Sequence, residues 1–145
     1  MAGDPPFETL HVSTVAIGDR AVLIAGEAGA GKSDLALRLI DRGAILVSDD
    51  YTRLRAVNGA LVASPPDTIA GKIEVRGLGI VTLPHVAESR VALLVELSGD
   101  VERMPERGET RRIAGIDVPM VAIDPQPASA PIKVELALAR LTEQA

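Results

Sequence analysis

Eight residues near the start of the chain have the types and spacing of a phosphate-binding loop. The run GEAGAGKS fits the pattern Gly-x-x-x-x-Gly-Lys-[Ser/Thr] without a mismatch. Glycines let the backbone curl so that several N–H groups point at one anion. Lys32, expected to point into an open site, can reach the outer phosphates of a nucleotide, and the Ser33 hydroxyl can bind Mg²⁺. The predicted nucleotide-binding residues are Gly26, Glu27, Ala28, Gly29, Ala30, Gly31, Lys32 and Ser33.

The segments on both sides of this loop predict the elements that hold it. The apolar run at 21–25 is typical of a buried strand, and residues 34–40 have apolar side chains at helical spacing before Gly43. A strand before the glycines and a helix after them is the context that the motif requires. The N-terminal end of the helix adds positive potential to the anion site.

A pair of acidic residues follows the next apolar run. Residues 44–47 predict a buried strand that ends at Ser48, Asp49 and Asp50. An acid at the carboxyl end of such a strand, one helix after the phosphate loop, is typical of a Walker B strand beside the metal and the phosphates. An Asp-Asp pair after a strand is also a common turn or cap. The placement of the pair favours the functional interpretation.

The segment IEVRGLGIV at 73–81 alternates charged and apolar residues around two glycines. In a single strand, Glu74 and Arg76 would share one face. An exposed edge strand with a glycine bulge explains the same pattern. The spacing alone does not favour a functional site over that explanation.

The remaining segments favour an α/β fold with a mixed, partly antiparallel sheet and few helices. A closing helix at about 132–142 would present Val134, Leu138 and Leu141 on one side, with Leu136 close by. The other predicted strands are 9–17, 51–57, 60–63 and 91–97, and residues 113–123 predict one or two strands. Asn58-Gly59, between 51–57 and 60–63, predicts a hairpin turn. We expect residues 1–8 to be a flexible lead-in and residues 9–145 to form a single domain.

The composition limits the classes of function. The chain has 145 residues, of which 47% are hydrophobic, and a net charge of −5, so we expect a globular protein that does not bind nucleic acid. No stretch approaches the ~20 apolar residues that a membrane span needs, and no signal peptide is visible. Cysteine is absent, which fits a reducing cytoplasm. We therefore expect a cytoplasmic protein with no membrane partner.

Taken together, these segments resemble the HPr kinase/phosphorylase family of bacteria. The likeness covers about residues 10–139 and is specific, because a Walker A motif followed by ExRGxG is a rare combination. His11 lies in a predicted strand before the phosphate loop, as the family's histidine does. The segment at 102–105 resembles the family's arginine-containing loop, and that at 131–134 resembles the start of its C-terminal helix. The resemblance implies a P-loop fold like that of HPr kinase and phosphoenolpyruvate carboxykinase.

The resemblance also implies a role for each matching position. Asp49 would take the proton from an attacking serine hydroxyl, and His11 and Arg103 would help to place that carboxylate and the phosphoryl group. In the family's reverse reaction, inorganic phosphate attacks phosphoserine and yields pyrophosphate. The implied catalytic residues are His11, Lys32, Asp49 and Arg103, the metal ligands are Ser33 and Glu74, and the supporting residues are Asp50, Arg76, Gly77 and Gly79.

The chain departs from the family pattern at several points. Ala28 stands where serine is usual, and Glu27 stands where aspartate is usual. The N-terminal domain usual in the family is missing, and the chain stops at Ala145 without the longer C-terminal tail, so it resembles a shortened form with the catalytic domain alone. We therefore expect stronger kinase activity than phosphorolysis. The family suggests a hexamer.

These observations predict an ATP- and Mg²⁺-dependent serine kinase, with phosphorylase activity as its reverse direction, that acts on HPr or a related phosphocarrier of the phosphotransferase system. One alternative is a small-molecule kinase, which usually needs an arginine-rich lid and a larger substrate domain. Another is a nucleotide-binding regulatory module without turnover, for which a base at Asp49 and a further acid at Glu74 are unnecessary. A GTPase is disfavoured because the Asn-Lys-x-Asp guanine motif is absent.

Overall fold

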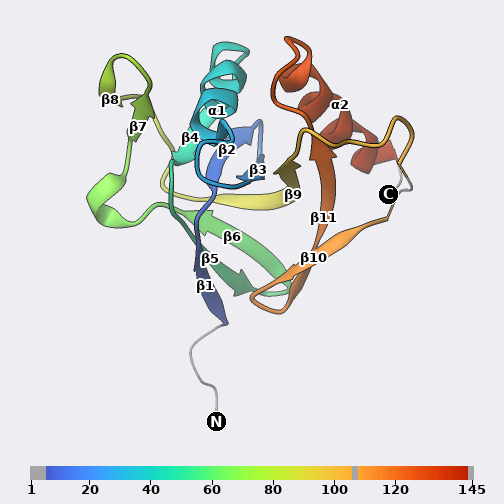
Figure 1. Cartoon of the computed structure of the whole chain (residues 1–145). Helices are drawn as coiled ribbons and strands as arrows, with labels where there is room; N and C mark the ends of the chain where they lie inside the picture. The colour runs from blue at the N-terminus through green and yellow to red at the C-terminus, as the bar shows by residue number, and fades with distance from the viewer. Residues whose placement is uncertain (1–5, 106–107, 144–145) are drawn as a thin grey trace.

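A curled, mixed sheet forms the centre of the fold, and α1 (Lys32–Asp41) and α2 (Ala130–Glu143) pack against one of its faces (Figure 1). The computed structural model describes residues 6–105 and 108–143. The main-sheet strands are β1 (Phe7–Leu10), β2 (Ser13–Ile17), β3 (Arg20–Ala25), β4 (Ile45–Ser48), β5 (Thr52–Val57), β6 (Ala60–Ser64), β9 (Ser89–Leu97), β10 (Thr110–Ile113) and β11 (Ile116–Ile123). A separate hairpin of β7 (Lys72–Val75) and β8 (Gly79–Thr82) follows a 3-10 turn at Asp67–Ile69. This arrangement confirms the predicted fold class.

Five strands of the main sheet, β3, β4, β5, β9 and β11, point in the same direction by their pairings. The sheet runs in the order β1-β5-β6-β9-β3-β2-β4, and β11 also pairs with β9. The pairings β3–β9 and β9–β11 are parallel, whereas β2 is antiparallel to both β3 and β4. The carboxyl ends of β4, β3, β9 and β11 therefore lie along one edge of the sheet, with the start of β2 between the first two. Ligands of α/β proteins bind at such edges.

The central strands bury side chains on both faces, which explains their continuous apolar sequence. On β3, Val22 and Ile24 pack in a core with Leu35 of α1, while Leu23 and Ala25 belong to a second core on the other face. This alternation follows from the two-residue period of a strand. The first core also contains residues of α2 and of β7, so the helices and the small hairpin are held to the same face of the sheet.

Side chains in α1 and directly after it form hydrogen bonds with other parts of the chain. The Arg42 guanidinium, next to the end of α1, donates hydrogen bonds to the Glu135 carboxylate of α2. That hydrogen bond and the attraction of the Glu135 charge raise the pKa of Arg42. Arg38 donates to the carbonyl oxygen of Pro125 at 2.8 Å, so the segment after β11 is fixed against α1. Neither helix of the described part is long and apolar enough to cross a membrane.

Two predicted strands are divided in the structure. The strand expected at 9–17 is β1 and β2, because β1 pairs with β5 while β2 pairs with β3 and β4. It also begins at Phe7, earlier than predicted, and residues 1–5 of the expected lead-in lie outside the described residues. The strand expected at 73–81 is the β7–β8 hairpin, in which Leu78 N–H donates to the carbonyl oxygen of Val75 at 2.9 Å.

Two expectations about side-chain placement were wrong. Glu74 and Arg76 do not share a strand face, because Glu74 pairs with Ile80 in the ladder and Arg76 lies in the turn after β7. Leu136 was expected close to the buried side of the last helix, but it is 63% exposed. Val134 and Leu138 are buried as predicted.

Candidate active site

The phosphate-binding loop, residues 26–31, connects the end of β3 to the start of α1. Gly26 allows a close approach, because a Cβ at this position would lie 3.2 Å from the Leu97 Cβ. Gly31 precedes α1 with a φ of 103°, a conformation that favours glycine. Because no side chain caps α1 with a hydrogen bond, the N–H groups of its first turn are suited to an anion. This geometry supports the phosphate-loop interpretation.

Lys32 folds back over the loop instead of pointing into an open site as the sequence suggested. The residue is 7% exposed, and its Nζ donates to the carbonyl oxygens of Gly26 at 2.9 Å and Glu27 at 3.1 Å. A buried ammonium group is costly unless hydrogen bonds compensate for its lost hydration. The loop carbonyls supply that compensation and hold the charge at the loop.

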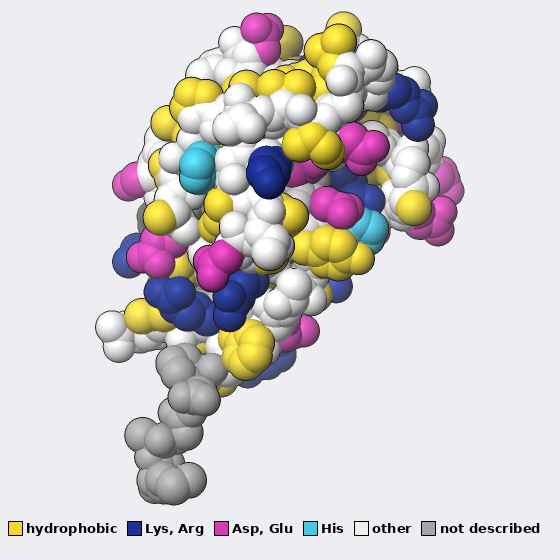
Figure 2. Space-filling model, turned by 90° about the vertical axis from the view of Figure 1, so that its left-hand side faces the viewer, with side chains coloured by type: hydrophobic (Ala, Val, Ile, Leu, Met, Phe, Trp, Pro, Cys, Tyr) yellow, Lys and Arg dark blue, Asp and Glu magenta, His cyan; other side chains and the backbone are white. Residues whose placement is uncertain are grey.

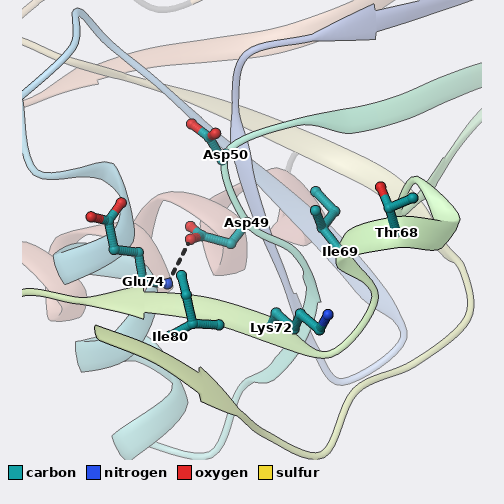
Figure 3. Close-up of a pocket in the computed structure, with 7 residues that line it drawn as sticks. All are labelled: Asp49, Asp50, Thr68, Ile69, Lys72, Glu74 and Ile80. Carbon is teal, nitrogen blue, oxygen red and sulfur yellow. Dashed lines mark hydrogen bonds between the residues drawn. The ribbon is translucent and has the colours of Figure 1, made fainter. Parts of the chain in front are cut away.

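Asp49 is the most connected polar group of the site. It is 5% exposed, and its Oδ1 accepts hydrogen bonds from the hydroxyls of Ser33 at 2.6 Å and Ser13 at 2.8 Å. Its Oδ2 accepts from the backbone N–H of Glu74 at 3.0 Å, the bond drawn in Figure 3. Three donors from α1, β2 and β7 therefore fix one carboxylate beside the phosphate loop.

A tight turn separates the two acidic side chains. The Tyr51 N–H donates to the Asp49 carbonyl oxygen at 2.8 Å, and Asp50 between them has a φ of 69°. This is a γ-turn with a positive central φ, a rare and strained conformation. As a result the Asp49 carboxylate is buried, whereas the Asp50 side chain is 59% exposed.

His11 contacts the exposed member of the acidic pair. It lies in the bend between β1 and β2, not within a strand as expected. Its Nε2 is 2.5 Å from Asp50 Oδ1, and its ring stacks on Tyr51 with centroids 4.8 Å apart. The structure thus brings His11 to Asp50, and the role of His11 in placing Asp49 stays a prediction.

A cavity of about 470 Å³ opens beside Asp49. In Figure 3, Asp49, Asp50 and Glu74 lie on one side of it and Thr68 and Ile69 on the other. Lys72 and Ile80 of the small hairpin complete the lining. Figure 2 views the molecule from the side of this hairpin and shows acidic, basic and hydrophobic side chains close together. A molecule in this cavity would lie next to Asp49.

Other predicted residues lie around this centre or apart from it. Arg76 and Gly77 are exposed in the turn of the small hairpin, and Gly79 begins β8. Arg103 lines a different cavity, between α2 and the connection after β9, and does not line the first one. The family resemblance assigned Ser33, Asp49 and Glu74 to one site, and the structure brings these residues together, but their roles, like that of Arg103, stay predictions.

Ser13, Thr68 and Lys72 belong to the site but were not predicted. Ser13 is completely buried and bonds both to Asp49 and to the Asp50 N–H, at 3.3 Å. The position of this small polar residue in the otherwise mostly apolar strand β2 could have indicated that it belongs to a polar site. Thr68 and Lys72 line the cavity because of the course that the chain takes from β6 into β7. No local sequence pattern predicts that course.

The oxygen groups at this centre suit Mg²⁺, which prefers one or two carboxylates together with water and phosphate oxygens. The Ser33 hydroxyl and the carboxylates of Asp49 and Glu74 are of the right kind. No group of three or more His, Cys, Asp or Glu residues that could hold a metal by itself occurs in the described residues. A nucleotide would have to supply the remaining ligands.

Comparisons with known proteins agree with this geometry. A family model described as the HPr Serine kinase C-terminal domain matches residues 6–143. The HPr kinase/phosphorylase of Clostridium beijerinckii is 33% identical over 134 residues, which cover 84% of this chain and 44% of that protein. The one from Limosilactobacillus reuteri is also 33% identical, over 97% of this chain and 46% of that protein. The chain thus spans less than half the length of these relatives.

A solved structure has the same fold. The Hpr(Ser) kinase/phosphatase from Coxiella burnetii matches with a TM-score of 0.81 and 33% sequence identity. The match covers 95% of this chain and 99% of that chain. The mixed sheet and its helices are therefore shared along nearly the whole of both chains.

Proposed function

The chain belongs to the HPr serine kinase C-terminal domain family, and we propose that it transfers the terminal phosphoryl group of ATP to a serine hydroxyl of HPr or a related phosphocarrier. The names of its relatives support both the acceptor and the reverse, phosphate-dependent reaction. A cytoplasmic location and a hexameric assembly stay predictions.

The observation that carries the proposal is the position of Asp49. Its carboxylate is bonded to Ser33 in the first turn of α1, and it also lines the 470 Å³ cavity. A base at this point can touch both a phosphate on the loop and a hydroxyl that enters the cavity. A nucleotide-binding module without turnover does not require this connection.

The chain's own residues suit the steps of the transfer. The acceptor serine enters the cavity, and Asp49 accepts its proton as the hydroxyl oxygen attacks the terminal phosphorus of ATP. The bond between that phosphorus and the bridging oxygen breaks, and ADP leaves with the bridging oxygen. Lys32 and the loop N–H groups hold the phosphate oxygens, so the charge that spreads over them is neutralised. Ser33 and Glu74 would hold Mg²⁺, which would supply positive charge to the phosphate oxygens.

Radioactive transfer tests this function. The chain is incubated with γ-labelled ATP, Mg²⁺ and HPr, and in parallel with an HPr variant in which the acceptor serine is alanine. We expect label on HPr and none on the variant. Label on neither protein, with MgATP bound by the chain, would contradict the proposed acceptor.

A further inference from the structure

A second cavity, of about 670 Å³, lies at the other end of the same sheet edge. It is formed by the connection after β9, the end of β11 and one side of α2, which Figure 1 shows next to each other. Val121 and Leu136 give it apolar surface, and Arg103, Lys133 and Arg140 give it positive charge. In the described part of the chain these three cations form no ion pair. Its volume lies within the roughly 300–1,000 Å³ range of small-molecule sites.

The phosphate loop lies next to the end of β9 and the segment after β11, and both of these segments lead into the lining of the second cavity. A Cβ on Gly26 would meet Leu97, and a Cβ on Gly31 would lie 4.0 Å from the Pro125 Cβ. The cavity lining begins at Gly99, two residues after Leu97, and includes Asp124, next to Pro125. The cavity therefore opens within a few residues of the loop, on the side away from β4.

The topology places the two cavities on opposite sides of the loop. Along the edge, the Asp49 end of β4 lies on one side of β3, and the ends of β9 and β11 lie on the other. In a phosphoryl transfer, the attacking and leaving oxygens stand roughly in line on opposite sides of the phosphorus. Because the attacking hydroxyl must be near Asp49, the leaving nucleotide must extend toward β9 and β11.

We propose that the second cavity binds the nucleoside part of ATP, an inference that rests on the function proposed above. Neither aromatic residue of the chain, Phe7 or Tyr51, lines it, so the base has no aromatic ring to stack on there. The base would instead lie on Leu136 and on the flat guanidinium of Arg103 or Arg140, which stacks well on aromatic faces. Asp124 is half-buried, and its Oδ1 accepts from the Gln126 N–H at 2.9 Å, so its other carboxylate oxygen is suited to a ribose hydroxyl.

Binding of MgATP compared with binding of magnesium tripolyphosphate tests the proposal without turnover. Both probes use the phosphate loop, but only ATP carries a nucleoside. Ala139 is an exposed α2 residue that lines the cavity, so Ala139→Trp fills the cavity from a helix surface. Ile132→Trp, on the same helix but outside the lining, is the matched control. We expect Ala139→Trp to weaken MgATP binding at least tenfold relative to the natural chain and to change tripolyphosphate binding by less than twofold. We expect Ile132→Trp to change neither affinity.

Photolabelling with 8-azido-ATP gives an independent readout on the natural chain. Labelled peptides should map to residues 99–103 or 133–140. Labelling at 67–80 would instead put the base in the Asp49 cavity and overturn the proposal, as would unchanged MgATP affinity in Ala139→Trp. These results differ from those expected if only the proposed kinase function is wrong. In that case no phosphate would be transferred to HPr, but the azido label would still map to the second cavity and tripolyphosphate would still bind.

Discussion

Replacing Asp49 by asparagine tests the centre of the site, because the expected losses follow from its hydrogen bonds. The carboxylate accepts from two hydroxyls through Oδ1 and from the Glu74 N–H through Oδ2. The asparagine amide has one acceptor oxygen, so if it serves the hydroxyls of Ser13 and Ser33, its NH₂ group faces the Glu74 N–H. Leaving a buried donor without an acceptor costs about 1–3 kcal/mol. The loss of a general base lowers transfer by roughly 10²–10⁴-fold.

Asp50→Asn is the matched control for this substitution. Asp50 is exposed, its carboxylate is bonded to His11, and asparagine tolerates its positive φ as well as aspartate does. We expect a stability change within about 0.5 kcal/mol for this variant. Urea unfolding of both variants without nucleotide measures the change in unfolding free energy. Label transfer to HPr measures the change in the rate of phosphoryl transfer.

Three outcomes would refute this reasoning. Transfer by Asp49→Asn within threefold of the natural rate, with MgATP bound normally, would remove Asp49 as the base. A larger loss of transfer in Asp50→Asn than in Asp49→Asn would show that the roles within the acidic pair are reversed. An unchanged unfolding free energy in Asp49→Asn would contradict the hydrogen-bond geometry itself.

Four further substitutions probe the loop and the fold, the last of them as a control. Lys32→Ala should abolish transfer and weaken magnesium tripolyphosphate binding in a titration, and unchanged turnover would exclude the phosphate-loop interpretation. Ala28→Ser adds a hydroxyl to the loop, and we expect it to raise phosphate-dependent dephosphorylation of phosphoserine-HPr more than forward transfer, as pyrophosphate release at several phosphate concentrations will show. Gly71→Ala would place a Cβ 2.6 Å from His85 Nδ1 at a φ of 76°, so unfolding free energy should fall by about 1–3 kcal/mol. Gly59→Ala, with a similar φ and nothing within 4 Å, should lose less in the same urea titration.

The sequence by itself determined the parts of this protein that depend on local physics. The glycines of the phosphate loop, the apolar run of β3 and the periodicity of α1 are neighbours in the chain, so the pattern predicted them together. The hairpin at Asn58-Gly59 was predicted for the same reason, since both residues need positive φ. The mixed sheet followed from the proportion of strands to helices.

Tertiary structure alone decided which distant groups meet. Ser13 reaches Asp49 because β2 lies between β3 and β4. Glu74 reaches it because the neighbouring Ile73 packs in the first core with residues of α1. Strand order and the division of 9–17 depend on pairing partners far along the chain, and no local pattern records those partners. The division of 73–81 is local, because β7 pairs with the adjacent β8. The separation of the two cavities has the same origin, because it results from the parallel alignment of β4, β3, β9 and β11 along one edge.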